Sequence, residues 1–239
     1  MKAKLLFSGK AIYRQCPHCE TTMKAPRLRF DCEDGYRYWS DGQADGGMFP
    51  VIVTKGACPA CGLPFVIRES ARIQLPKGRH GRDIPEMLAL DTDAYRLLID
   101  QKISSGNLLD EKSLRIDWWH HLNDATRSGH RRSKPPVDAA WETILEQNLS
   151  CLSSLLDETV TDERVKKAEL CRELGQFDQC MELLISLPGK HHWVASLIST
   201  HAVAGNHELF GLLRTPAGWQ PMPPASRNGI DNTQGVPEC

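Results

Sequence analysis

The spacing of hydrophobic positions divides the chain into two parts with different secondary structure. Short apolar stretches mixed with basic and turn-forming residues predict β-strands at 10–14, 23–30, 51–54 and 63–68. After residue 86, apolar residues recur every three or four positions, which predicts amphipathic helices. The stripes are Tyr95, Leu98, Ile99 and Ile103; Leu114, Trp118 and Leu122; Trp141, Leu145, Leu149, Leu152 and Leu156; Val165, Ala168, Cys171 and Leu174; and Val194, Leu197, Ile198, His201 and Ala202. The chain is therefore expected to be an α+β protein.

Proline and glycine residues mark the boundaries between these parts. The segment LPKGRHGRDIP contains two prolines, two glycines and three basic residues, a composition typical of a linker. The last 24 residues contain five prolines and no periodicity, which predicts a flexible tail. We therefore expect an N-terminal domain at 1–74, a linker at 75–85, an α-helical domain at 86–215 and a flexible tail at 216–239.

Two CPxC repeats lie in the N-terminal part. A CxxC turn brings two sulfurs close together, and two such turns complete the tetrahedral shell of four thiolates that structural Zn²⁺ prefers. Gly62, which follows the second repeat, can adopt the positive φ that such turns need, whereas Glu20 stands at the equivalent position of the first. The predicted ligands are Cys16, Cys19, Cys58 and Cys61. With the strands around them, they predict a small antiparallel zinc ribbon.

Other interpretations of the cysteines explain less. A redox CxxC needs a single pair, and disulfides need an oxidising compartment, so neither accounts for two pairs. The 38 residues between the repeats exceed the usual gap of a compact ribbon. Cys32, which lies in that gap, is the candidate substitute ligand.

Composition and charge limit the possible cellular location and partners of the protein. The hydrophobic content of 41% suffices for packed cores, and no run of about 18 apolar residues suggests a membrane span. The nine cysteines are interpreted as reduced thiols of a cytoplasmic protein. Residues 1–82 carry 14 basic and 7 acidic side chains, and the remainder 15 and 23, so the charges are +7 and −8. This polarity suits an acidic partner of the first part, or docking of the two halves on each other.

Aromatic side chains are the candidate contacts for a partner. The segment 31–50 is rich in Gly and Asp and also carries Trp39, which either packs over the metal site or forms part of a recognition surface. Trp118 and Trp119 precede two histidines, but neighbouring residues on a helix point about 100° apart, so only part of this run can face one site. The candidate partner-binding residues are Trp39, Trp119, Arg68 and Arg72.

The helical part carries a resemblance to a known repeat. The segment AELCRELGQFDQCMELLISLP, residues 168–188, resembles a tetratricopeptide-type helix pair, in which Gly175 closes the first helix, Phe177 lies between the helices and Cys180 allows close approach. With YRYWSDGQADGGMFP and LRIDWWHHLND, the organisation of residues 12–205 resembles bacterial proteins of unassigned activity that join a zinc ribbon to a helical domain. The resemblance implies an all-α, tetratricopeptide-like second domain, and it implies no activity.

Motifs for catalysis are missing from the sequence. It contains no GxxxxGK[ST], GxSxG or helix-opening GxGxxG, and a four-thiolate zinc shell has no open position for an activated water. We therefore expect a non-enzymatic adaptor that binds another protein. A nucleic-acid-binding ribbon is the alternative, since Arg68, Arg72 and other arginines accompany aromatic residues that could stack on bases.

Overall fold

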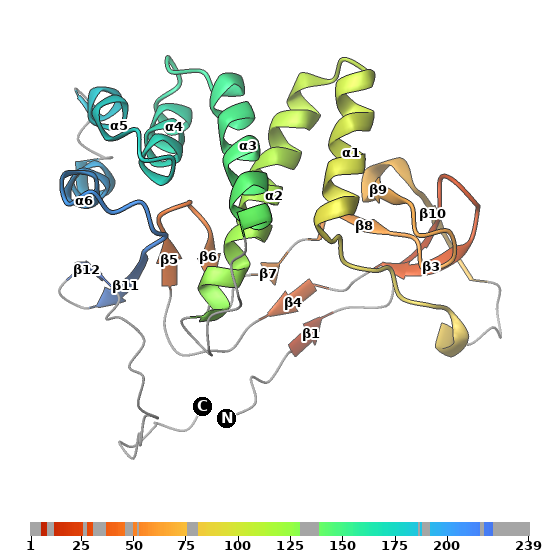
Figure 1. The fold of residues 1–239 in the computed structure, drawn as a ribbon. Coiled ribbons are helices and arrows are strands. Elements are labelled where there is room, and N and C mark those ends of the chain that lie inside the picture. Colours follow the sequence, from red (N-terminus) through yellow and green to blue (C-terminus); the bar gives the residue numbers. More distant parts are fainter. Residues whose placement is uncertain are drawn as a thin grey trace, which may run out of the picture.

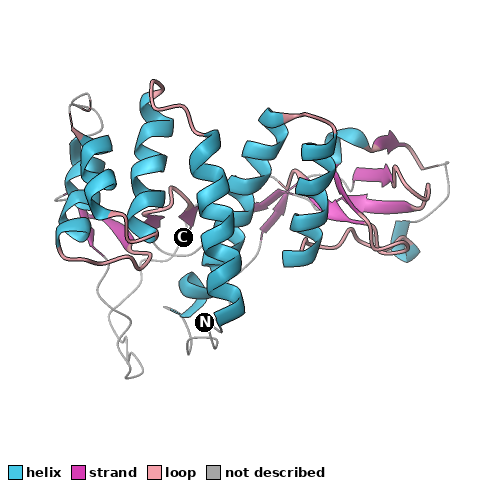
Figure 2. Cartoon of the chain, turned by 45° about the horizontal axis from the view of Figure 1, so that its top comes forward, coloured by secondary structure: helices cyan, strands magenta, loops and turns pink. Residues whose placement is uncertain are grey.

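The computed structural model describes residues 6–8, 12–25, 28–30, 37–45, 50–51, 53–75, 81–129, 139–185, 187, 192–215 and 218–221. These residues form an α+β structure in which helices stand side by side in a row and short antiparallel strands lie along one side of it (Figure 1, Figure 2). The strands are β1 (Leu6–Ser8), β2 (Ile12–Gln15), β3 (Thr22–Ala25), β4 (Leu28–Phe30), β5 (Arg37–Trp39), β6 (Ala44–Asp45), β7 (Pro50–Val51), β8 (Lys55–Ala57), β9 (Pro64–Val66), β10 (Ala71–Ile73), β11 (Gly211–Thr215) and β12 (Gly218–Pro221). The helices are α1 (Thr92–Ser104), α2 (Leu108–Gly129), α3 (Ala139–Leu155), α4 (Thr161–Glu173), α5 (Phe177–Leu184) and α6 (His192–Val203), with short 3₁₀ helices η1 (Ile67–Glu69) and η2 (Gly81–Asp83).

Two small sheets carry the cysteine repeats at one end of the molecule. One sheet has the strand order β10-β2-β3, and the β8-β9 hairpin forms the other. Residues just before α1 join them, because Met87 N–H donates to Lys24 O (2.9 Å) and Leu88 N–H donates to Ala57 O (3.0 Å). Met87 is also buried in the core between the sheets. The strands predicted around both repeats are present, and the stretch predicted as one strand at 23–30 is divided into β3 and β4, which belong to different sheets.

The helical row is built on the stripes that the sequence predicts. Trp118 packs in a cluster with Leu98, Ile99 and Leu114, whereas Trp119 packs in another with Leu149. The two adjacent tryptophans thus face different cores, as the 100° step between neighbouring helical residues requires. Cluster residues Ala57 and Val66 of β8 and β9 also pack on α1, so the row is joined directly to the cysteine-bearing end.

The helix pair predicted from residues 168–187 is present as α4 and α5. Gly175 has a φ of +72°, Gly175 N–H donates to Arg172 O (3.0 Å) and Gln176 N–H donates to Cys171 O (2.8 Å), which together form a Schellman C-cap. Cys180 is fully buried at the contact between the two helices, and Phe177 is half-buried against the same cluster. A short turn closed by glycine therefore explains the tight pairing of α4 with α5.

A sheet formed by strands from distant parts of the chain was not predicted. Its order is β12-β11-β5-β6, with Gly211 opposite Trp39 and Leu213 opposite Arg37. The expectation of an all-α second domain is corrected here, because β11 and β12 continue the hairpin of residues 37–45. β12 falls within the stretch predicted as a flexible tail, and the rest of that stretch lies outside the described residues. The boundary at residue 74 stays a prediction, and this sheet crosses it.

The remaining described strands form the sheet β1-β4-β7. None of the helices in the described part of the chain combines the length and the apolar character that crossing a bilayer requires.

Candidate metal centre

The two CPxC turns have the same backbone construction. The first repeat, residues 16–19, follows β2, and the second, residues 58–61, follows β8. Glu20 N–H donates to Cys16 O (3.0 Å), as Gly62 N–H donates to Cys58 O (2.9 Å). We call each turn a knuckle. Because both are closed by a hydrogen bond to the carbonyl of their first cysteine, each holds its two sulfurs in a fixed relation.

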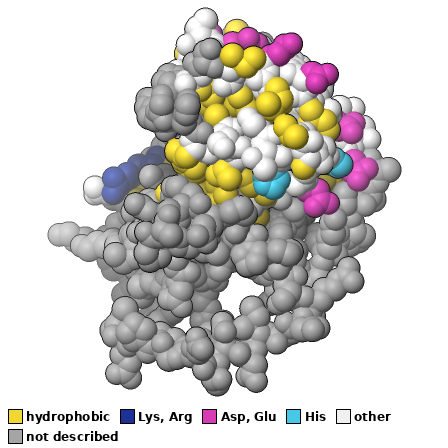
Figure 3. Space-filling view, turned by 90° about the vertical axis from the view of Figure 1, so that its left-hand side faces the viewer, with side chains coloured by type: hydrophobic (Ala, Val, Ile, Leu, Met, Phe, Trp, Pro, Cys, Tyr) yellow, Lys and Arg dark blue, Asp and Glu magenta, His cyan; other side chains and the backbone are white. Residues whose placement is uncertain are grey.

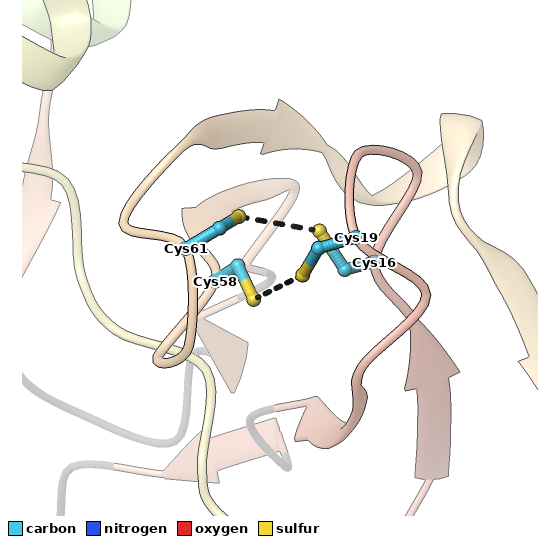
Figure 4. A group of neighbouring side chains, drawn as sticks. All are labelled: Cys16, Cys19, Cys58 and Cys61. Atoms are coloured by element: carbon cyan, nitrogen blue, oxygen red, sulfur yellow. Dashed lines mark hydrogen bonds between the residues drawn. The ribbon is translucent and has the colours of Figure 1, made fainter.

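The four sulfurs converge between the knuckles (Figure 4). All four Sγ atoms lie within 4.8 Å of one another; Cys16 and Cys61 are separated by 3.8 Å, and Cys19 and Cys58 by 3.6 Å. A disulfide needs an S–S distance of about 2.05 Å, and all four are free thiols here. Around a cation 2.3 Å from each sulfur, the edge of a regular tetrahedron is about 3.8 Å. The arrangement is therefore that of a four-thiolate metal site, and the predicted ligand set comes together.

Both knuckles need a residue in the left-handed backbone region directly after the second cysteine. Gly62 has a φ of +73°, which confirms the prediction made from its identity. Glu20 has a φ of +60°, the one positive φ of a non-glycine residue among the described residues. A side chain in this region costs about 1–2 kcal/mol, so the first knuckle is the more strained of the two.

The polar surroundings of the sulfurs favour thiolates in the presence of a cation. His18 N–H donates to Cys16 Sγ and Ala60 N–H donates to Cys58 Sγ, each over 3.4 Å. Hydrogen bonds from the Thr21 side chain and backbone lower the pKa of the Cys19 thiol to about 6. Although a hydrogen bond from the Leu63 backbone opposes the change, burial and the three neighbouring sulfurs raise the pKa of Cys61 to about 12. Each deprotonated sulfur thus makes deprotonation of a neighbouring thiol less favourable, and a bound divalent cation offsets this repulsion.

The site is half embedded in a small core. Cys16 and Cys58 are buried with Met23, Phe65 and Met87, whereas Cys19 and Cys61 are exposed. The His18 ring is not among the clustered ligands; its Nε2 lies 3.2 Å from Pro64 O and joins the first knuckle to β9. The metal would therefore hold together two sheets that share few apolar contacts of their own. Cys32, the candidate substitute ligand, lies outside the described residues.

The candidate partner-binding residues do not form one surface. The side chains of Trp39 and Trp119 are 3% and 0% exposed, so neither projects from the surface as a free aromatic contact, and both belong to the lining of a hollow described below. Trp119 Nε1–H donates to Glu173 Oε2 (2.9 Å), so its polar edge is used inside the protein. Arg68 and Arg72 are exposed at the metal-binding end, where Arg68 pairs with Asp110.

Sequence reasoning missed a buried polar junction between the hairpin of residues 37–45 and α2. Asp41, whose side chain is fully buried, forms an ion pair with Arg127 and accepts a hydrogen bond from Asn123 Nδ2 (3.1 Å). His120 Nε2 lies 3.1 Å from Asp41 O, and burial lowers the pKa of this histidine. Asp41-Gly42 reads as a turn in the sequence, but nothing there indicates a partner more than 80 residues away.

A second buried polar group lies on α4. Arg172 pairs with Glu169 and donates through Nη1 to Asn206 O (2.5 Å), with its guanidinium 5.0 Å from the centre of the Phe210 ring. Glu173 is half-buried beside this pair with its Oε1 buried, and desolvation, with the charges of Glu169 and Asp41, raises its pKa to about 8. The junction and this group tie together α2, α4 and the β12-β11-β5-β6 sheet, which we call the four-stranded sheet.

A hollow of about 280 Å³ lies next to the four-stranded sheet. Its lining is mainly apolar and aromatic and comes from the hairpin, α2, α4, α6 and β11. Its lining includes the aromatic residues Tyr38, Trp39, Trp119, Trp193 and Phe210. Leu197 also lines it, as do Asp162 and Lys166 from α4. We call this space the aromatic hollow.

Comparison with known proteins finds no family model, curated protein or solved structure that matches this chain. Four sulfurs fill a tetrahedral shell, so an ion held there has no coordination position left for water or substrate. The centre can fix two turns relative to each other, which is the role of a structural ion.

Proposed function

We propose that the four cysteines hold one Zn²⁺ and that the protein is a non-enzymatic adaptor that binds another protein through its helical half. The sulfur separations of 3.6 and 3.8 Å support zinc, because they match the edges of a tetrahedral Zn–S₄ shell. Thiolates also favour zinc over calcium or magnesium. In this proposal the ion stabilises the N-terminal sheets and takes no part in chemistry.

The aromatic hollow is the observation that carries the proposal of a protein partner. Its volume of about 280 Å³ suits one large apolar side chain, and Trp193 at its edge is 41% exposed. An aromatic side chain filling a pocket is the usual energetic centre of a protein interface. We therefore assign to the hollow the anchor side chain of a partner segment.

The charge of the surrounding helices indicates which residues of the partner segment lie next to the anchor side chain. Residues 139–203 contain five basic and ten acidic side chains, a net charge of −5. Seen from the α5 and α6 side, apolar side chains gather on the surface, and acidic side chains lie along the upper and right-hand edge of this face (Figure 3). Met181, Ile185 and Val203 are among the exposed apolar residues of these helices and their ends. The partner segment we propose thus carries basic residues next to an apolar or aromatic anchor.

The alternative, nucleic-acid binding by the cysteine-bearing end, has weaker support. Trp39, one of the residues considered for base stacking, is 3% exposed, and Arg68 is already paired with Asp110. Exposed Arg72 remains available at that end. Because Trp39 is too buried to stack on a base and Arg68 is engaged, the protein partner is the better-supported proposal.

The test is capture by the full-length chain from nuclease-treated and untreated lysate, followed by binding measurements with the purified partner. Leu197→Asp places a charge in the aromatic hollow and should abolish binding. Leu97→Asp changes a leucine that is 41% exposed on α1 and should leave binding intact. Capture that nuclease abolishes and Leu197→Asp does not affect would replace the adaptor with the nucleic-acid alternative.

A further inference from the structure

A second cleft, of about 400 Å³, lies between the cysteine-bearing sheets and α2. Arg14 from β2, Lys55 from β8 and Arg68 from η1 line it together. Thr54, Asp110 and Ser113 add polar groups, and Val53, Val66, Ile67 and Leu114 add apolar surface. Three cations from three separate elements thus converge on one space that the proposed metal and partner sites do not use.

Arg14 is held in this cleft without a carboxylate. Its Nη1 donates to Ser70 O (2.9 Å), and its Nε is buried with no hydrogen-bond acceptor among the described residues. In the register of β2 and β10, Arg14 stands directly opposite Arg72, so both side chains leave the same face of the sheet. Like charges placed opposite each other destabilise a sheet, and within the described ranges no carboxylate pairs with either arginine.

Lys55 adds a poorly hydrated cation. Its side chain is 10% exposed, it pairs with Asp117, and its Nζ lies 5.9 Å from the centre of the Tyr95 ring. Burial lowers the pKa of Lys55 to about 8, while the Asp117 carboxylate acts in the opposite direction. A cation in such a place gains more from an added anion than one in water does.

We propose that this cleft binds the phosphate group of a small molecule. Phosphate presents several acceptors to the fork of donors on a guanidinium, and its charge would reduce the repulsion between Arg14 and Arg72. The volume of the cleft is in the range of small-molecule sites, and its apolar residues would contact the part of the ligand that carries the phosphate group. Asp110 opposes an anion, but it is engaged by Arg68 and by Asn107 Nδ2 (2.8 Å).

The experiment is titration of the full-length protein with inorganic phosphate by calorimetry at constant ionic strength. Arg14→Gln should weaken binding by about tenfold or more, because it removes a charge-assisted contact. Asp110→Asn should tighten binding several-fold, because it removes the opposing charge. Arg164→Gln is the matched control: Arg164 Nε is also buried without a partner but lies on α4, so phosphate binding should not change.

Unchanged phosphate affinity in both Arg14→Gln and Asp110→Asn would overturn the proposal. If Arg14→Gln does not fold, as judged by metal content and thermal unfolding, Asp110→Asn decides the outcome alone. A second comparison uses a nucleoside monophosphate and a long single-stranded oligonucleotide at equal phosphate concentration. Tighter binding of the monophosphate supports a small-molecule site, whereas binding of the oligonucleotide alone, falling steeply with salt, would contradict it.

Discussion

The metal centre and the Asp41 junction both bury groups that are costly to remove from water, and they compensate that cost differently. At the metal centre, Cys16 and Cys58 are buried near two further thiols, and the compensating charge is an ion from solution. At the junction, the carboxylate of Asp41 is buried and its compensating charge is Arg127, supplied by the chain itself. The first region therefore depends on conditions outside the protein, and the second does not.

If the four cysteines hold the proposed ion, the chain has one part whose folding is coupled to metal and another part whose folding is not. The sheets around the knuckles share a core of few residues, among them Met23, Phe65 and Met87. The helices pack in three groups of buried side chains, of which two are larger than the core around the knuckles. Removal of the metal should act on the former region first.

The largest expected effect is that of Cys58→Ser. The change removes one ligand of four, and structural zinc sites contribute about 10–16 kcal/mol of binding energy to folding in small domains. We expect loss of the metal and loss of hydrogen-exchange protection in β2, β3, β8 and β9, with protection in α3 to α6 retained. Cys151→Ser, at an exposed free cysteine, is the control and should change neither. Simultaneous loss of protection in α4 and α5 would show that the two regions are not separable.

Asp41→Ala should destabilise the junction without affecting the metal. It removes the buried counter-ion of Arg127 and leaves only the exposed carboxylate of Asp124, and breaking a buried ion pair typically costs about 3–5 kcal/mol. The measurement is the free energy of unfolding in urea together with metal content. Asp124 is the other carboxylate that contacts Arg127, and the Asp124 side chain is 60% exposed. Asp124→Ala should therefore cost less than about 1 kcal/mol. Equal effects of the two changes would contradict the central place of Asp41.

Glu173→Gln should make the helical half less sensitive to pH. Because the pKa of folded Glu173 is raised to about 8, the folded state keeps a proton that the unfolded state loses at lower pH, and stability falls as pH rises toward 8. Glutamine keeps an acceptor for Trp119 Nε1–H and cannot ionise. We expect the variant to gain more than about 1 kcal/mol over wild type at pH 8.5, and less at pH 5. A constant difference across this range would show that Glu173 does not titrate as proposed.

The smallest effects are expected at the two knuckle residues with positive φ. Gly62→Ala introduces a side chain at φ +73° and should cost about 1–2 kcal/mol. Glu20→Gly relieves the same strain at φ +60°, with part of the gain offset by the greater freedom of glycine in the unfolded chain, so a gain under about 1 kcal/mol is expected. Thermal unfolding of the metal-loaded protein measures both, and a loss of stability in Glu20→Gly would contradict the shared backbone construction.

Whether a feature could be predicted from the sequence depends on how far apart along the chain its interacting residues lie. The spacing of the cysteines and the glycine after Leu174 act within a few residues, so the ligand cluster and the α4–α5 turn were predicted correctly. The pairing of β11 with β5 joins residues about 170 apart in the sequence. The residues of a five-residue strand do not determine which distant strand it pairs with. The same holds for Asp41, because a buried carboxylate and a solvated one look alike in sequence.

X-ray absorption at the zinc edge of freshly purified full-length protein, combined with elemental analysis, tests the central claim most directly. The account predicts one zinc per chain, surrounded by four sulfurs at about 2.3 Å and no light-atom ligand. Protein without zinc, or zinc bound by fewer than four sulfurs and by nitrogen or oxygen, would contradict the assignment of Cys16, Cys19, Cys58 and Cys61 as a closed structural site.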